Sequence, residues 1–239
     1  MKAPVWPSFV LVHGNFLGPW SWERVAETLR ARGAHVVAPD LPSAAGDSAP
    51  GDLYADARTV RDALDATHAP VILCGHSYGG AVITEAGAEH PAATRLVYLA
   101  GAVPDIGQHL ASLAPAVPDN TPEDKGEQVR ALPDGRIELT PESAAHALFH
   151  DCSPAERDRA LRNLRPSNPA TGAQPLTRAA WHATPATYVR CRHDRMPELV
   201  SSGFTATNPL TVELPTGHCP NWSAPDDVAE LLLAEAGRI

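Results

Sequence analysis

Cys74-Gly75-His76-Ser77-Tyr78-Gly79-Gly80 lies between a short apolar, β-branched run and a run of small residues. This order predicts a strand, a sharp turn and a helix, with Ser77 at the turn. A serine in such a turn has a strained backbone, and glycines at positions 75 and 79 avoid side-chain collisions across it. Ser77 is therefore a candidate nucleophile, although the same pattern also occurs by chance in glycine-rich turns.

Apolar runs and amphipathic segments alternate on both sides of this turn. Strands are expected at 8–12, 35–38, 71–73, 96–100, 187–191 and 210–214. Helices are expected at 22–33, 53–64, 81–90, 197–206 and 223–236. Because strands and helices alternate, the sequence predicts an α/β fold: a mostly parallel central sheet with helices on both faces and right-handed crossovers.

The alternation stops between Pro104 and Pro185. This segment is rich in proline and contains a charged stretch at 123–127, a turn at 133–136, and two N-caps followed by proline, at Thr140 and Ser153. A segment of this kind inserted between strands is expected to cover the sheet as a cap. The predicted organisation is a core of residues 1–103 and 186–239, with a cap insertion at 104–185.

Composition limits the classes of partner. The 239 residues suffice for one α/β domain, and a formal net charge of −9 without a Lys or Arg cluster argues against nucleic acid. The sequence opens with no secretion signal and holds no apolar run near the roughly 20 residues that span a bilayer. The four cysteines lack Cys-x-x-Cys spacing and are expected to be reduced. We expect a cytoplasmic protein that acts on a small molecule, without a membrane partner; a homodimer is left open.

A serine nucleophile needs a histidine to take its proton and a carboxylate to orient that histidine. His218 follows the last expected strand and would reach the same edge of the sheet as Ser77, so it is the candidate base. Asp194 follows the strand at 187–191 and is the preferred acid. Asp105, which follows the preceding strand, is the alternative acid.

The reaction also needs two hydrogen-bond donors aimed at the developing oxyanion. One is expected to be the backbone N–H of Tyr78, at the start of the helix after the turn. The second is expected from the loop after the first strand, through the backbone N–H of Asn15. The aromatic residues near the expected site loops or in the cap are pocket candidates, with core packing as the alternative role for each: Phe16, Tyr78, Phe149, Trp181 and Trp222.

Five motifs occur together along the chain: Leu11-Val12-His13-Gly14, Ala38-Pro39-Asp40-Leu41-Pro42, Cys74-Gly75-His76-Ser77-Tyr78-Gly79-Gly80, Leu96-Val97-Tyr98-Leu99-Ala100 and Thr216-Gly217-His218. Over nearly the whole length, the sequence resembles the small α/β-hydrolases that include plant methylesterases, hydroxynitrile lyases and bacterial esterases. The resemblance implies an α/β-hydrolase fold, a triad of Ser77, Asp194 and His218, and no cofactor; no metal is expected.

The hydroxynitrile lyases carry a lysine directly after the catalytic histidine, whereas this chain has Cys219 there. The difference argues against a cyanohydrin lyase. The sequence therefore predicts a serine hydrolase that cleaves a small, mostly apolar ester, lactone or thioester through an acyl-enzyme. Two alternatives stay open: a non-hydrolytic enzyme of the same fold that performs C–C cleavage or a lyase step, and a small-molecule binding protein with a vestigial triad.

Overall fold

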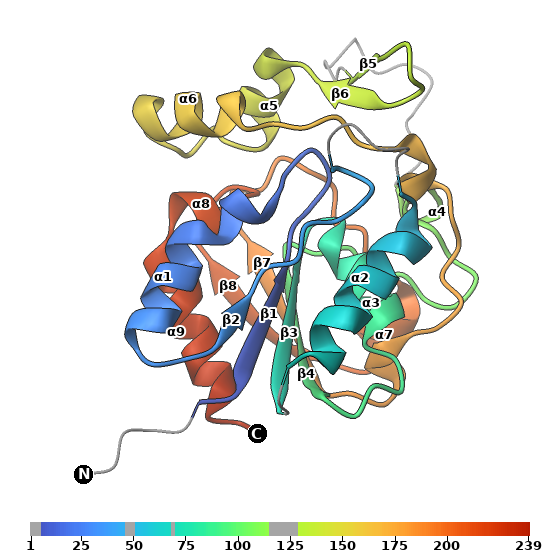
Figure 1. Ribbon diagram of the computed structural model, residues 1–239, viewed down its shortest axis with the longest axis vertical. Coiled ribbons are helices and arrows are strands. Elements are labelled where there is room, and N and C mark those ends of the chain that lie inside the picture. The colour runs from blue at the N-terminus through green and yellow to red at the C-terminus, as the bar shows by residue number, and fades with distance from the viewer. Residues whose placement is uncertain (1–5, 46–50, 68–69, 115–128) are drawn as a thin grey trace.

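The computed structural model describes residues 6–45, 51–67, 70–114 and 129–239. Within these ranges, six strands form one parallel sheet in the order β2-β1-β3-β4-β7-β8 (Figure 1). The strands are β1 (Ser8–Val12), β2 (Val36–Val37), β3 (Val71–His76), β4 (Ala93–Leu99), β7 (Ala186–Cys191) and β8 (Leu210–Leu214). The predicted α/β fold with a parallel sheet is confirmed. The charged stretch at 123–127 lies outside the described residues.

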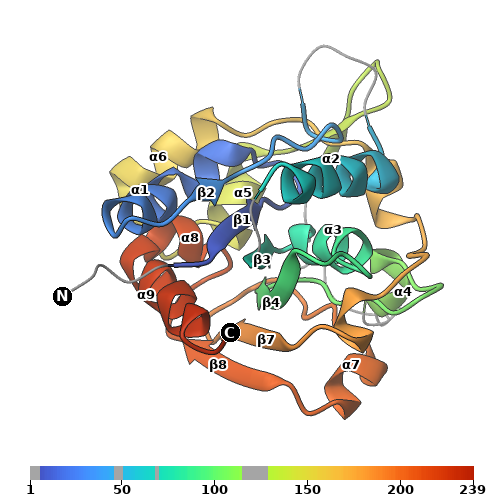
Figure 2. The same ribbon diagram turned by 60° about the horizontal axis from the view of Figure 1, so that its bottom comes forward.

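Helices cover both faces of the sheet (Figure 2). One face carries α1 (Glu23–Ala31), preceded by the 3₁₀ turn η1 (Pro19–Trp22), together with α9 (Pro225–Ala236). The other face carries α2 (Leu53–Asp65) and α3 (Gly79–Ala86). The winding direction reverses between β1 and β3, because the chain leaves β1 for β2 on one side and returns to β3 on the other. Ligands of open α/β sheets bind at such a reversal.

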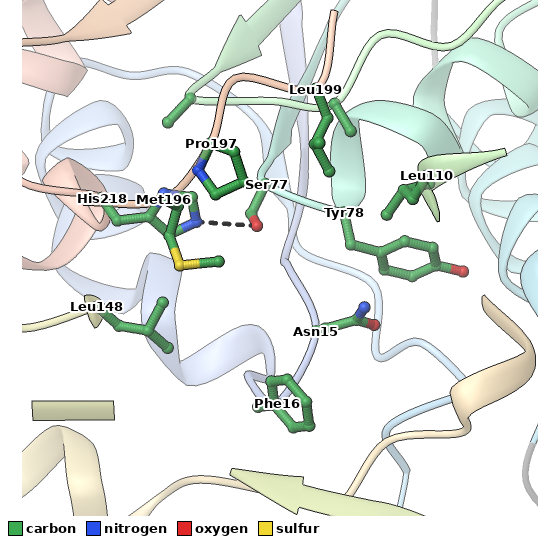
Figure 3. A pocket seen from close by; sticks show the side chains of 12 residues that line it. Asn15, Phe16, Ser77, Tyr78, Leu110, Leu148, Met196, Pro197, Leu199 and His218 are labelled. Atoms are coloured by element: carbon green, nitrogen blue, oxygen red, sulfur yellow. Dashed lines mark hydrogen bonds between the residues drawn. The ribbon is translucent and has the colours of Figure 1, made fainter. Parts of the chain in front are cut away.

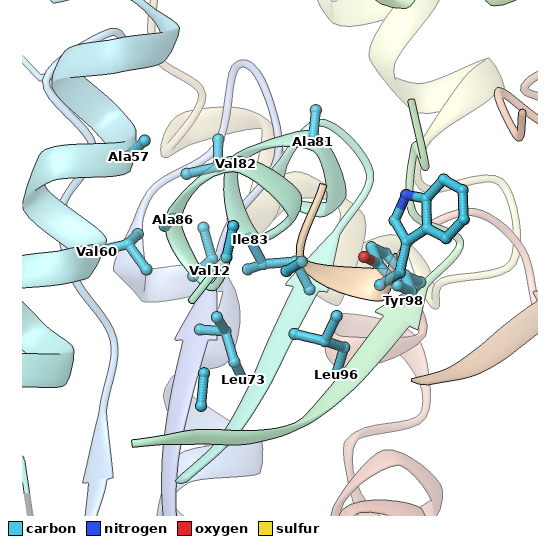
Figure 4. Close-up of a cluster of buried hydrophobic side chains, with 14 of the residues drawn as sticks. Val12, Ala57, Val60, Leu73, Ala81, Val82, Ile83, Ala86, Leu96 and Tyr98 are labelled. Atoms are coloured by element: carbon cyan, nitrogen blue, oxygen red, sulfur yellow. The ribbon is translucent and has the colours of Figure 1, made fainter. Parts of the chain in front are cut away.

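Two apolar layers hold the helices against the sheet. Successive strand residues point to opposite faces. In β1, Phe9 and Leu11 pack under α1 and α9, and Val10 and Val12 pack under α2 and α3. Figure 4 shows the second layer, where small residues of α3 lie against Leu73 and Leu96 of the strands. At the start of α3, Gly80 allows close packing on the chain after β4, because a Cβ atom there would lie 2.4 Å from the Ala102 carbonyl oxygen.

Three helix boundaries differ from the prediction. The helix after the Ser77 turn ends at Ala86 and not near residue 90, because Glu89 adopts a left-handed φ of 56°. The helix expected at 197–206 is only α7 (Ser202–Ala206), because Ser201 caps it by accepting a hydrogen bond from the Phe204 N–H. Proline 225 divides the last helix into α8 (Pro220–Ser223) and α9.

The segment between β4 and β7 begins with α4 (Leu110–Leu113). It continues with a hairpin of β5 (Val129–Ala131) and β6 (Ile137–Leu139), followed by α5 (Pro141–Ala147) and α6 (Pro154–Arg162). The hairpin and both predicted helix starts are confirmed. The hairpin, α5 and α6 lie over one end of the sheet (Figure 1). The chain then returns beside α3 through η2 (Pro169–Gly172) and η3 (Ala180–His182).

Candidate active site

The turn between β3 and α3 holds Ser77 in a left-handed conformation, with φ at 53°. A Cβ atom at Gly75 would lie 2.3 Å from the Gly79 carbonyl oxygen, so the expected collision across the turn explains this glycine. Glycine is required at position 79 for a different reason: a Cβ atom added there would lie 2.5 Å from the Val12 carbonyl oxygen. Gly79 therefore lets β1 pass directly beside the turn, and the backbone strain at Ser77 is held by packing on both sides.

Ser77, His218 and Asp194 form a chain of hydrogen bonds. Asp194 Oδ2 lies 2.8 Å from His218 Nδ1, and Ser77 Oγ lies 2.9 Å from His218 Nε2 (Figure 3). An ionised carboxylate can only accept a hydrogen bond, so Nδ1 carries the ring proton and donates. Nε2 of the neutral imidazole is then free to accept from the Ser77 hydroxyl. The arrangement can move a proton from serine to histidine.

Asp194 stays ionised although it is largely buried. Burial acts to raise its pKa, but the interaction with His218 and the hydrogen bond from the Met196 N–H, 2.8 Å from Oδ1, outweigh burial and hold the pKa below the ordinary value. The other predicted candidate, Asp105, lies elsewhere: its Oδ1 is 2.8 Å from Nε2 of His182. The structure thus brings Asp194, and not Asp105, to His218.

The loop that carries His218 is fixed by two further side chains. His76 Nε2 donates to the His218 carbonyl oxygen at 2.8 Å, and Asp151 accepts from the Gly217 N–H at 2.6 Å. Burial, assisted by the nearby His218, lowers the pKa of His76 to about 3. His76 is therefore neutral and serves as a donor to the main chain. Asp151 belongs to the segment between α5 and α6, so that segment also contacts the loop.

The loop after β1 is organised by His13. The Leu41 N–H donates to His13 Nε2 at 3.2 Å, so Nδ1 carries the proton and donates to the Gly14 carbonyl oxygen at 2.9 Å. Burial lowers the pKa of His13 to about 4, which keeps this ring neutral. No acceptor in the described part of the chain binds the backbone N–H of Asn15 or of Tyr78. Both are free to donate to a ligand beside Ser77.

A pocket of about 130 Å³ opens onto Ser77. Ser77 lies between Met196 and Pro197 on one side and Tyr78 on the other (Figure 3). The pocket is lined by Asn15, Phe16, Ser77, Tyr78, Ala100, Ala102, Leu110, Leu148, Met196, Pro197, Leu199 and His218. The Tyr78 hydroxyl points away from the pocket and donates to buried Asp56 at 2.7 Å. Apart from Asn15, the lining beyond Ser77 and His218 is therefore largely apolar.

Three of the predicted pocket residues do not line this pocket. Phe149 and Trp222 are buried in a cluster formed by residues 137–164 and by the loops after β1 and β8. Trp222 packs edge-on against Trp20, with 5.1 Å between ring centroids. Trp181 is buried against α3 and donates from Nε1 to the Pro104 carbonyl oxygen. These three side chains are buried in the core, whereas Phe16 and Tyr78 line the pocket.

Sequence reasoning missed seven apolar residues that line the pocket: Ala100, Ala102, Leu110, Leu148, Met196, Pro197 and Leu199. Met196, Pro197 and Leu199 lie two to five residues after Asp194, and this position was the signal that could have identified them. The expected helix at 197–206 hid that signal. In the structure the chain there is extended and forms a bridge between Val200 and Val103, which carries it over the pocket.

Three further features concern metal ligands, Cys219 and membrane-spanning helices. Among the described residues, no three His, Cys, Asp or Glu side chains gather closely enough to hold a metal ion. Cys219, directly after His218, is buried in the same cluster as Trp222 and does not line the pocket. Within the described ranges, no helix combines the length and apolar character needed to cross a bilayer.

A parallel sheet with a strained serine between β3 and α3, hydrogen-bonded to a histidine beyond the last strand, is the arrangement of α/β-hydrolases. Residues 9–231 match the model of the alpha/beta hydrolase family, and the chain belongs to this family. The resemblance inferred from the sequence motifs is thereby confirmed.

Similar proteins match most of the chain. Probable hydrolase R7 of a Phoma species is 28% identical over 97% of this chain and 98% of its own. Salicylic acid-binding protein 2 of Nicotiana tabacum is 30% identical over 80% of each chain. Among solved structures, a pyrethroid hydrolase from Sphingobium faniae superposes with a TM-score of 0.79 at 22% identity, covering 97% of both chains. At that identity the last comparison shows the shared fold.

Proposed function

We propose that this protein is a serine hydrolase that cleaves a small, mostly apolar ester, lactone or thioester through an acyl-enzyme. The observation that carries the proposal is the hydrogen-bonded chain from Ser77 through His218 to Asp194, which opens onto an apolar pocket. Family membership and the name of the Phoma relative support a hydrolytic reaction.

In the proposed mechanism, Ser77 Oγ attacks the carbonyl carbon of the substrate while His218 Nε2 takes the serine proton. Asp194 holds the imidazole in the required tautomer and stabilises the imidazolium. The backbone N–H groups of Asn15 and Tyr78 donate to the oxyanion, each worth on the order of 3 kcal/mol in the transition state. His218 returns the proton to the leaving group, and water then hydrolyses the acyl-enzyme with His218 again as base.

The pocket lining supports the proposed substrate class. Among the described residues that line it, there is no Lys, Arg, Asp or Glu. A charged substrate group would lose its hydration there without gaining a partner, whereas apolar groups gain from burial. We expect short-chain neutral esters to be better substrates than esters that carry a charge near the scissile bond.

We further propose that residues 104–185 act as a cap that selects the substrate. Leu110 and Leu148 from this segment line the pocket, and Asp151 contacts the loop of His218. The catalytic groups come from the sheet edge, so changes at the two leucines should alter substrate preference more than chemistry.

Turnover of p-nitrophenyl butyrate by the wild-type protein and by Ser77→Ala tests the mechanism. We expect the substitution to reduce kcat by on the order of 10⁴-fold or more with the fold intact. Ser202→Ala is the matched control, because Ser202 is exposed on α7 and is not among the residues that line the pocket, and this variant should keep wild-type turnover. Undiminished turnover by Ser77→Ala would sink the proposed mechanism.

A second candidate function is small-molecule binding without turnover, which the name of the tobacco relative favours. One experiment distinguishes the two candidate functions. Esterase activity is measured on a wild-type preparation, and the affinity of the same preparation for salicylic acid is then measured by titration. Tight binding combined with no turnover of any ester tested would favour the binding protein.

A further inference from the structure

The main chain of Phe16, next to the proposed oxyanion donor, is held by a distant segment of the chain. Its N–H donates to Ser167 Oγ at 2.8 Å, and its carbonyl oxygen accepts from the Arg165 N–H at 2.9 Å. Phe16 has a left-handed φ of 64°, which costs a residue with a side chain on the order of 1 kcal/mol or more. The two hydrogen bonds to segment 165–167 hold this conformation.

Ser167 is itself firmly placed. It exchanges two backbone hydrogen bonds with Ile137 of β6, at 2.8 and 2.9 Å, and the next residue, Asn168, donates to the Ser43 carbonyl oxygen at 3.0 Å. Only 1% of Ser167 is exposed. Because these hydrogen bonds fix the backbone at residues 167 and 168, the Ser167 hydroxyl is a rigid acceptor for the Phe16 N–H.

The Ser167 hydroxyl binds one of two neighbouring backbone N–H groups and leaves the other free. Asn15 and Phe16 both offer a backbone N–H on the loop beside Ser77, and Ser167 occupies that of Phe16. The N–H of Asn15 has no acceptor in the described part of the chain. The same loop packs tightly on the nucleophile, since a Cβ atom at Gly14 would lie 2.8 Å from Ser77 Cβ. A small shift of the loop would therefore displace the Asn15 donor.

We propose that Ser167 is a positioning residue for the oxyanion hole: by binding the Phe16 N–H, it fixes the loop so that the Asn15 N–H is directed at the oxyanion. The proposal rests on the proposed hydrolase function. Ser167 does not touch the substrate, since it is absent from the pocket lining, and it acts through the main chain of Phe16.

The test compares Ser167→Ala with Thr171→Val. Thr171 is a matched control because it is also 1% exposed, lies four residues away, and uses its hydroxyl on the Asn168 carbonyl oxygen at 2.8 Å and not on Phe16. Both variants lose one buried hydroxyl, so a general loss of stability should affect both. Thermal unfolding of each variant identifies the temperature range in which it is folded.

With p-nitrophenyl butyrate, Ser167→Ala should lower kcat about 10- to 100-fold, less than the 10²- to 10³-fold expected for the complete loss of a donor. KM should change by less than about threefold, because the interaction is made in the transition state. An alkyl trifluoromethyl ketone reports the same effect: Ser77 adds to its carbonyl carbon, the serine proton passes to His218, and the ketone oxygen becomes an oxyanion. Its affinity should fall in parallel with kcat, while that of the matching alcohol is unchanged.

A readout without turnover keeps the two proposals separate. In wild type the Phe16 amide should exchange slowly with deuterium by NMR, and Ser167→Ala should accelerate this exchange while Thr171→Val should not. If wild type hydrolyses the ester but Ser167→Ala loses no more kcat than Thr171→Val, the positioning role is wrong and the hydrolase function stands. If no ester is hydrolysed, the hydrolase function fails, and the positioning role fails with it. Unchanged Phe16 exchange in Ser167→Ala would overturn the positioning role in either case.

Discussion

At Asp194, burial and hydrogen bonding act on one carboxyl group in opposite directions, and hydrogen bonding prevails. The pKa of this group stays below its ordinary value, so the carboxylate is charged at neutral pH. Nδ1 of His218 donates to this carboxylate at 2.8 Å, and the Met196 N–H donates to its other oxygen at 2.8 Å. We therefore expect the carboxylate to set the histidine tautomer.

Replacement of Asp194 by Asn should lower kcat by on the order of 10⁴-fold, because the amide can donate to Nδ1 and so favours the wrong tautomer. Asp105→Asn is the matched control, since Asp105 pairs with His182 outside the pocket. Steady-state kinetics with p-nitrophenyl butyrate compares the two. A larger loss in Asp105→Asn than in Asp194→Asn would show that the acid has been misassigned.

At the scale of the elements, the turn between β3 and α3 depends on the passage of β1 beside it. Gly79 provides this space, because a Cβ atom there would meet the carbonyl oxygens of Val12 and His13 at 2.5 and 2.8 Å. Backbone atoms cannot move aside as side chains do. The position of the nucleophile is thus coupled to the position of the loop that carries Asn15.

Gly79→Ala should destabilise the protein by roughly 2 kcal/mol or more, because β1 or the turn has to shift. The control is Gly172→Ala in η2, where no atom lies within 4 Å of the added Cβ and the backbone is not left-handed. That substitution should change stability by less than about 1 kcal/mol. Urea denaturation measures both, and equal effects in the two variants would contradict this account of the turn.

The sequence predicted the elements well where a local signal fixed them. Each expected strand exists, and Thr140 and Ser153 cap their helices as their side chains indicated. The predicted start of α7 is wrong, because Ser201 lies inside the predicted helix at 197–206 but caps the observed one. Ser77, His218 and Asp194 could be chosen because each follows a strand of one sheet. Ser167 could not, because its contact with Phe16 spans 151 residues and leaves no local pattern.

At the scale of the whole molecule, two buried neutral histidines connect the site to folding stability. His13 and His76 have pKa values of about 4 and about 3 in the folded state, chiefly because burial disfavours their charged forms. In the unfolded chain their pKa is about 6.5. Between these values the unfolded state binds protons that the folded state does not, so stability falls as the pH drops below about 6.5.

Each of these histidines should contribute a slope of about 1.4 kcal/mol per pH unit to the free energy of unfolding between about pH 6 and pH 5. Urea denaturation at pH 7.5, 6 and 5 measures this dependence. His76→Gln can keep a donor to the His218 carbonyl oxygen but has no titrating ring. The slope of its unfolding free energy with pH should therefore be smaller by about the contribution of one histidine. Identical slopes in wild type and His76→Gln would show that His76 is not buried in its neutral form.

The central claim is that Ser77 is the nucleophile, and covalent trapping tests it most directly. The wild-type protein is treated with an alkyl fluorophosphonate, digested, and its peptides are analysed by mass spectrometry, with Ser77→Ala treated in parallel. We predict a single phosphonyl adduct on the peptide that contains Ser77, none on Ser77→Ala, and loss of esterase activity in proportion to labelling. Loss of activity with the adduct on a different residue, or full activity after complete labelling of Ser77, would contradict the claim.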